Sequence, residues 1–142
     1  MNTMEKWVTT TDALVAALKR ALLQAQSFAY SDGPSGAYTA SLLEKLGIAE
    51  QMRPKTKLTS GPVAELLASG EAEIGVQQIV AILPVEGAQL VGPLPGELQN
   101  VIVYAAGVAS RAGDAALARA FIAFMATDEA RRILRANGLE LG

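Results

Sequence analysis

The sequence Phe28-Ala29-Tyr30-Ser31-Asp32-Gly33-Pro34-Ser35-Gly36-Ala37-Tyr38 predicts a strand, a tight polar turn and a helix in immediate succession. An apolar run over residues 27–30 stops at Ser, Asp, Gly and Pro, and a helical apolar pattern starts directly after them. This order places unpaired backbone N–H groups and small hydroxyls at one point, which favours binding of an anion or a polar head group. The same polar residues could equally serve only to cap the helix and fill the turn.

The strand, turn and helix succession recurs twice along the chain. The predicted strands occupy residues 27–30, 55–59 and 73–78, and the helices that follow them occupy residues 35–46, 62–69 and 79–83. Repeated strand-then-helix units of this length indicate crossover connections and a mainly parallel sheet. The predicted fold class is therefore α/β.

Polar residues stand at the carboxyl ends of all three predicted strands. They are Ser31–Ser35, Ser60-Gly61 and Gln77-Gln78, and Ser60 is also expected to cap the helix that follows it. In open parallel sheets ligands bind outside the carboxyl ends of the strands. We therefore expect these three clusters to converge on one edge.

The remaining segments are predicted from local signals. A first helix is expected to start at Thr9–Asp12, strands are expected at residues 89–92 and 101–109, and Asp114 and Thr127 are expected to cap the last two helices. Residues 93–96 are the clearest linker. Trp7 and Tyr104 are expected to pack in the core or at an interface.

Composition excludes several classes of function. The 142 residues contain no Cys and no His, which rules out disulfides, thiol nucleophiles, His-based triads and Cys/His zinc sites. We expect no metal and no cofactor. The net charge of −2 without a basic block argues against nucleic acid, and no apolar run reaches the roughly 20 residues of a membrane span. No signal peptide is expected, so a complete chain would be cytoplasmic.

Four segments together resemble a known family. They read "SFAYSDGPSGAYTASLLEKLGI" at 27–48, "SGPVAELLASGEAEIGVQQ" at 60–78, "PLP" at 93–95 and "ALARAFIAFMATDEARRILRANGLE" at 116–140. This resembles the later portion of bacterial molybdate-type periplasmic solute-binding proteins of ABC importers. The resemblance implies the second lobe of a type II periplasmic-binding-protein-like fold, a three-layer parallel or mixed sheet with helices on both faces, and a periplasmic location.

The resemblance also implies a domain organisation and a partner. One domain would contain a lobe-like unit at 8–92, a hinge-like linker at 93–100, and a return strand with C-terminal helices at 101–142. Nothing in the sequence corresponds to the family's first lobe. Because the apolar return segment would lack the lobe on which it packs, we expect a homodimer, and the family implies an ABC permease as a further partner.

Carried over position by position, the resemblance assigns ligand contacts to Ser31, Ser35, Gly36, Ser60, Gln78 and Gln77. The family's molybdate binders place a Tyr near Gln78, so the glutamine favours another polar or anionic solute. Asp32 beside the expected site also disfavours a multiply charged oxyanion by like-charge repulsion.

Two other functions remain open. Asp32 with Tyr30 or Tyr38 could supply a general base and an oxyanion donor for an isomerase-type enolisation, to which Glu65 or Glu73 could contribute. The chain could also be an effector-sensing domain of a transcriptional regulator, since such regulators use the same two-lobed fold. It contains no helix-turn-helix segment, so it would then be a fragment.

Overall fold

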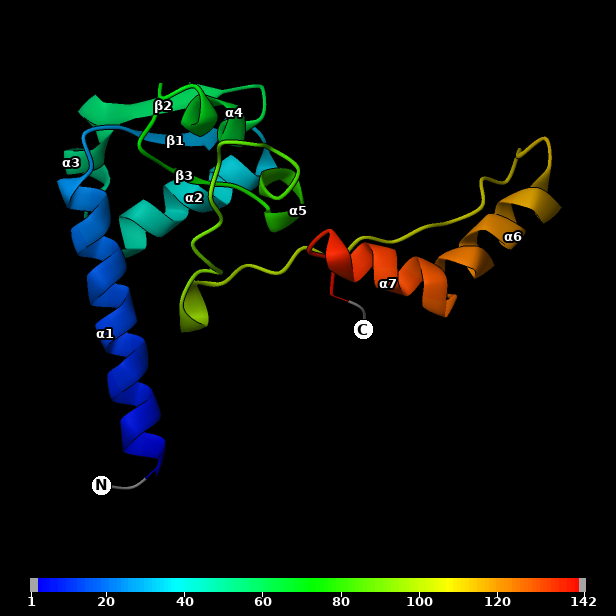
Figure 1. Ribbon diagram of the computed structural model, residues 1–142, viewed down its shortest axis with the longest axis horizontal. Helices are drawn as coiled ribbons and strands as arrows, with labels where there is room; N and C mark the ends of the chain where they lie inside the picture. The colour runs from blue at the N-terminus through cyan, green and yellow to red at the C-terminus, as the bar shows by residue number, and fades with distance from the viewer. Residues whose placement is uncertain (1–2, 141–142) are drawn as a thin grey trace. The chain divides into compact units, whose positions relative to one another are not determined.

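The computed structural model describes residues 3–140, with side chains from Thr11 onward. The expected role of Trp7 therefore lies outside the described side chains. The chain divides into two compact units, Met1–Asn100 and Val101–Gly142, and each is described by itself (Figure 1). No helix in the described part of the chain is long and apolar enough to cross a membrane.

The first unit is built on three strand-then-helix steps, as predicted. Its elements are α1 (Thr3–Gln24), β1 (Phe28–Ser31), α2 (Pro34–Lys45), α3 (Ala49–Met52), η1 (Arg53–Lys55), β2 (Thr56–Thr59), α4 (Val63–Ala68), β3 (Ile74–Val76), α5 (Ile79–Ile82) and η2 (Gly96–Leu98). The strands form one parallel sheet in the order β2-β1-β3. This confirms the predicted α/β class.

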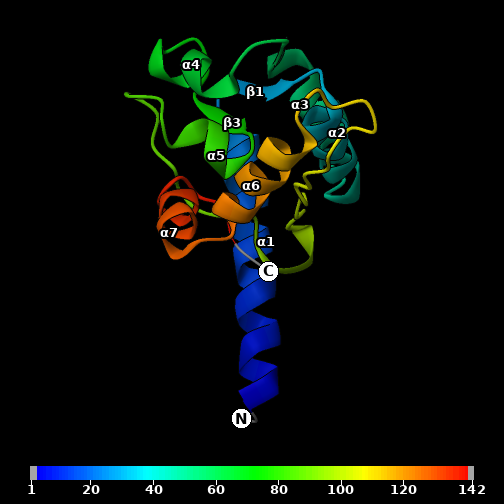
Figure 2. The same ribbon diagram turned by 90° about the vertical axis from the view of Figure 1, so that its right-hand side faces the viewer.

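Strand β1 alternates its side chains between two apolar layers. Phe28 is fully buried in a cluster with residues of α1, α2 and α3, whereas Ala29 is buried with Val63 of α4 and Ala72. Successive residues of a strand point to opposite faces, so this pattern requires helices on both faces. Figures 1 and 2 show α2 and α4 on opposite sides of the strands. The architecture is three-layered.

The first helix begins earlier than predicted. Helix α1 starts at Thr3, so the expected start at Thr9–Asp12 is wrong. The threonines at 9, 10 and 11 lie inside the helix. A β-branched residue costs only a few tenths of a kcal/mol within a helix, so a cluster of good capping residues does not by itself start one.

Two predicted strands are absent. Residues 89–92 and 101–109, all within the described part of the chain, form no strand. Strand propensity reflects packing against a paired neighbour rather than an intrinsic backbone preference. Neither β-prone run has a paired strand beside it, so both remain irregular.

The linker is anchored to the first unit. Leu94 and Leu98 pack against the core cluster, and the hydroxyl of Tyr38 donates a hydrogen bond of 2.6 Å to the carbonyl oxygen of Leu98. Gly96 has a φ of +54° and lies against the Thr11 side chain, 2.6 Å from where its own Cβ would be. Only glycine combines this backbone conformation with such a close approach.

The second unit contains α6 (Ala115–Met125) and α7 (Asp128–Ala136). Asp114 accepts a hydrogen bond from the Leu117 N–H at 2.8 Å, and Thr127 accepts one from the Ala130 N–H at 3.4 Å. Both predicted caps are confirmed. Gly138, with a φ of +85°, follows the end of α7.

Candidate functional site

The carboxyl edge of the sheet, where β1, β2 and β3 end, brings together residues that are far apart in the sequence. Ser31 at the end of β1 lies in register with Thr59 at the end of β2. The hydroxyls of Ser31 and Ser35 share a hydrogen bond of 2.9 Å, and both side chains are half-buried. The end of β1 and the first turn of α2 therefore present two hydroxyls at one point.

Gly36 explains how α2 comes so close to the end of β1. A Cβ at this position would lie 1.5 Å from the Ser31 carbonyl oxygen, so any side chain would displace the helix. The Gly36 N–H donates to the Gly33 carbonyl oxygen at 2.9 Å. The main role of Gly36 is therefore to let α2 pack closely against β1, which fixes the position of the α2 N-terminus at the edge.

Asp32 links the turn after β1 to the turn after β2. Its N–H donates to the Thr59 carbonyl oxygen at 3.0 Å, and its Oδ2 accepts a hydrogen bond from the Ser60 hydroxyl at 2.7 Å. Both side chains are exposed. The structure thus joins Ser60 and Asp32 across the edge.

The expected capping role of Ser60 is wrong. Residue Pro62 occupies the N-cap position of α4 and no cap side chain binds there, because the Ser60 hydroxyl is directed to Asp32 instead. The residue that caps α4 is Gln77, which follows β3. Its Oε1 accepts a hydrogen bond from the Ala64 N–H at 3.1 Å. A residue after β3 therefore satisfies a backbone donor in the first turn of α4.

The two glutamines have different positions. Gln77 is half-buried and bound to α4, whereas Gln78 is the N-cap residue of α5, with an extended backbone at φ −60° and ψ 138°. Sequence reasoning grouped them as one polar cluster. It also missed Thr59, whose Oγ1 accepts a hydrogen bond from the Gly61 N–H at 2.9 Å. The signal for that turn was a Thr directly before Ser-Gly.

The two tyrosines of the isomerase hypothesis are engaged elsewhere. The Tyr38 hydroxyl binds the Leu98 carbonyl oxygen, and the Tyr30 ring lies against the core, 5.7 Å from the Phe28 ring centre. Among the described side chains, no hydrogen bond joins Asp32 to either tyrosine. The structure does not assemble the three residues into one hydrogen-bonded group.

The carboxyl edge carries acidic side chains and no basic ones: Asp32 follows β1, and Glu65 lies in the first turn of α4. The segments 31–36, 59–64 and 76–79, which include the ends of the three strands and the turns after them, contain Asp32 but no Lys or Arg. Among the side chains that the structure describes, no group of three or more His, Cys, Asp or Glu residues could hold a metal ion. The chemistry of this edge is therefore that of hydroxyls, amides, backbone N–H groups and the carboxylates of Asp32 and Glu65.

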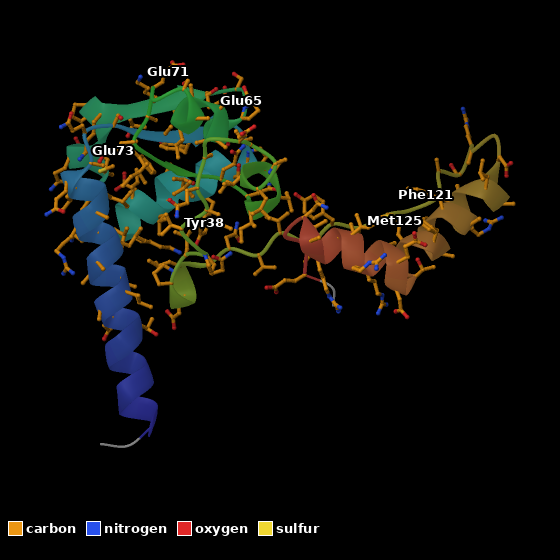
Figure 3. All side chains as sticks on the ribbon, viewed as in Figure 1. Tyr38, Glu65, Glu71, Glu73, Phe121 and Met125 are labelled. Atoms are coloured by element: carbon orange, nitrogen blue, oxygen red, sulfur yellow. The ribbon has the colours of Figure 1, made fainter. Side chains whose placement is uncertain are left out.

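At the opposite, amino edge of the sheet, two charged residues form hydrogen bonds with neighbouring segments of the same unit. The Lys55 ammonium donates to the carbonyl oxygens of Leu22, Leu23 and Ala25 at 2.9, 2.7 and 2.7 Å. Glu73 Oε2 accepts the Gln26 N–H at 2.8 Å, and the Glu73 N–H donates to the Ser27 hydroxyl at 3.0 Å. Figure 3 shows Glu73 close to the end of α1.

The second unit contains a shallow depression of about 400 Å³. It is lined by Asp128, Glu129 and Arg132 of α7. These exposed side chains carry charges of both signs and belong to one helical face. None of the residues that sequence reasoning selected as ligand contacts lines this depression.

Two comparisons relate the chain to known proteins. Residues 5–140 match the model of the family described as "Bacterial extracellular solute-binding protein". The chain is 31% identical over 126 residues to an aconitate isomerase from Pseudomonas sp, a match that covers 87% of this chain and 48% of that enzyme. The chain thus spans about half the length of the curated relative that it matches. No solved structure matches. Since the family model covers nearly all of the sequence, the chain belongs to the bacterial extracellular solute-binding protein family.

Proposed function

We propose that the chain binds a small polar solute at the carboxyl edge of its sheet. One observation carries the proposal: the parallel register brings Ser31, Ser35, Asp32 and Ser60 together beside the N-terminus of α2. Family membership supports a binding role, because solute-binding proteins act by holding a small molecule. The fold alone would not assign this role.

Helix α2 supplies the main binding groups. Its N-cap residue is Gly33, which has no side chain to cap the helix, and Pro34 follows it. The first N–H groups of a helix have no partner within the helix, and the dipole there favours an electron-rich group. Pro34 has no N–H, and the Gly36 N–H already donates to the Gly33 carbonyl oxygen, so the Ser35 N–H is the first-turn donor left for an acceptor on the solute. The hydroxyls of Ser31 and Ser35 would rearrange toward the same acceptor.

The proposed site is one half of a complete site. A single sheet edge leaves most of a small ligand in water, whereas binding pockets usually cover most of the ligand surface. We propose that a second copy of the chain covers the solute. The second unit supports association because Leu117, Phe121 and Phe124 on α6 are all exposed.

The resemblance to binding proteins of ABC importers extends the proposal to transport. In this role the chain would work in the periplasm and pass its solute to an ABC permease. Molybdate itself is disfavoured, because Gln78 replaces the family's Tyr and Asp32 stands beside the proposed site.

A binding titration with matched variants tests the proposal. Isothermal titration with a panel of small polar solutes is expected to find a ligand whose affinity falls about tenfold in Ser35→Ala and Gln78→Ala. Ser69→Ala is the control, because Ser69 also donates a hydrogen bond but lies at the end of α4. Equal affinity in all of these proteins would contradict the proposed site.

The oligomeric state is a separate measurement. Analytical ultracentrifugation of the whole chain at micromolar concentration is expected to give the mass of a dimer. A monomer at that concentration, with or without the bound solute, would contradict the second copy as the covering surface.

A second candidate function is isomerisation of a carboxylic acid, favoured by the relative named aconitate isomerase. Asp32 would act as the general base, since it is exposed at the edge and close enough to Ser60 for a hydrogen bond. Interconversion of the aconitate isomers, followed by chromatography, tests it directly. Turnover that disappears in Asp32→Asn would support this function, whereas absence of turnover by the whole chain would contradict it.

A further inference from the structure

The charge of Asp32 is not balanced by a neighbouring cation. The described side chains contain one ion pair, between Arg53 and Glu50, and Asp32 has no part in it. Asp32 Oδ2 accepts the Ser60 hydroxyl, which leaves Oδ1 open to a solute. A binding edge with carboxylates that have no cationic partner, and with no Lys or Arg, is unusual for a site that would take a highly charged anion.

The position of the Asp32 carboxylate disfavours solutes that carry several negative charges. Ser31, directly before Asp32, shares its hydroxyl bond with Ser35, so the acceptor-binding groups and the carboxylate lie on neighbouring residues. Consecutive Cα atoms lie about 3.8 Å apart, so a solute anion held at Ser31 would be near enough to Asp32 for the two charges to repel each other. At an exposed site, like charges at such a distance weaken binding about fivefold for each additional charge on the solute.

The same carboxylate attracts a hydrogen-bond donor. An ammonium or hydroxyl group next to Asp32 Oδ1 would form a charge-assisted hydrogen bond, which is about twice as strong as one between neutral groups. The edge thus offers donors at the hydroxyls of Ser31 and Ser35 and at the Ser35 N–H, and an acceptor at Asp32.

We propose that Asp32 is a specificity-determining residue that selects a solute carrying both an acceptor end and a donor end. The chemical class is a small monocarboxylate with an ammonium or hydroxyl group beside the carboxylate. Multiply charged carboxylates and oxyanions are rejected. The inference rests on the proposed function, since it assigns a ligand class to the same edge.

Amide NMR of the whole ¹⁵N-labelled chain tests the inference site by site. The probes are L-serine, which has a carboxylate, an ammonium and a hydroxyl, and trans-aconitate, which is a tricarboxylate, each at constant ionic strength. L-Serine is expected to shift the amide signals of Ser35, Gly36 and Ser60. Its dissociation constant is expected to be about tenfold or more lower than that of trans-aconitate at these signals.

Two variants separate the charge of Asp32 from its other effects. Asp32→Asn keeps an oxygen for Ser60 and removes the charge, so it is expected to reduce the preference for L-serine about tenfold or more. Glu71→Gln is the matched control, because Glu71 is also an exposed carboxylate that accepts a serine hydroxyl, from Ser69 at 3.0 Å. This control is expected to leave both dissociation constants within twofold of the original.

The outcomes distinguish this inference from the proposed function. If trans-aconitate shifts the edge signals at concentrations equal to or below those of L-serine, the charge selection is wrong, but the binding edge stands and the isomerase gains support. If the preference persists in Asp32→Asn, another residue determines it and the inference is overturned. If neither probe shifts the edge signals, the inference is overturned, and the proposed function is then decided by the titration with the wider panel of solutes.

Discussion

The two edges of the same parallel sheet are both polar, yet their polar groups do different things. At the amino edge, the side chains of Lys55 and Glu73 form hydrogen bonds with the backbone of residues 22–26, at the end of α1 and in the segment that leads to β1. At the carboxyl edge, the side chains of Ser31, Ser35 and Asp32 form their hydrogen bonds with other small polar side chains. The polar groups of the amino edge thus stabilise the fold, whereas those of the carboxyl edge can exchange their hydrogen bonds for bonds to a solute.

Helix termini explain the difference. The last turn of α1 has no basic residue of its own, so its open carbonyl groups are satisfied by the ammonium of Lys55, which lies some 30 residues further along the chain. Helix α2 instead begins at a glycine without a capping side chain. At the amino edge, the charged Lys55 side chain satisfies carbonyl groups at the end of α1. At the carboxyl edge, no side chain caps the start of α2.

Gly36→Ala is expected to cause the largest loss of stability at either edge of the sheet. The new Cβ would overlap the Ser31 carbonyl oxygen, so α2 must move away from β1. We expect a loss of unfolding free energy of about 3 kcal/mol or more, measured by urea denaturation. In the control Gly33→Ala the new Cβ meets only the Ser31 hydroxyl, at 4.0 Å, and we expect a change below about 1 kcal/mol. Equal losses would contradict the close contact.

Lys55→Met tests the amino edge. The variant keeps most of the side-chain length but removes three hydrogen bonds to open carbonyl groups at the end of α1. We expect urea denaturation to show a loss of about 2 kcal/mol. In Lys57→Met, on the same sheet but exposed, the change should stay within about 0.5 kcal/mol. A solute affinity that falls in Lys55→Met more than in Ser35→Ala would break the division between the edges.

Gln77→Ala tests the bridge between β3 and α4. Without the side-chain oxygen, the Ala64 N–H loses its acceptor at the start of the helix. We expect a loss of about 1 kcal/mol in the thermal or urea unfolding transition. Gln89→Ala changes an exposed glutamine in an irregular segment and should have no measurable effect. No difference between the two variants would show that α4 does not need this cap.

Asp32→Asn should have the smallest effect on stability. The asparagine oxygen can still accept the Ser60 hydroxyl, and no ion pair is lost. We expect the free energy of unfolding to change by less than about 0.5 kcal/mol while solute selection changes strongly. A loss above about 1.5 kcal/mol would place Asp32 with the structural charges of the amino edge.

Local signals account for what could be predicted from the sequence. The three strand-then-helix steps and the caps at Asp114 and Thr127 depend on residues within a few positions of each other, and the structure confirms them. The roles of Lys55 and Gln77 depend on partners 30 or more and 13 residues away, which no local pattern reveals. The run at 101–109 has strong strand propensity, yet propensity forms a strand only beside a partner.

Part of the candidate site was also out of reach of sequence reasoning. The convergence of Ser31, Ser35 and Ser60 followed from the parallel sheet and needed no side-chain detail. The pairing of Ser60 with Asp32, in place of a helix cap, depends on whether the hydroxyl donates to a carboxylate 28 residues away or accepts a backbone N–H of α4. Tyr38 looked available for chemistry because its acceptor, the Leu98 carbonyl, lies 60 residues away.

A crystal structure of the whole chain soaked with L-serine tests the central claim most directly. The account predicts difference density at the carboxyl edge, with the carboxylate near Ser31 and Ser35 and the ammonium near Asp32. Density at the amino edge beside Lys55 and Glu73, or in the α7 depression lined by Asp128, Glu129 and Arg132, with an empty carboxyl edge, would contradict it.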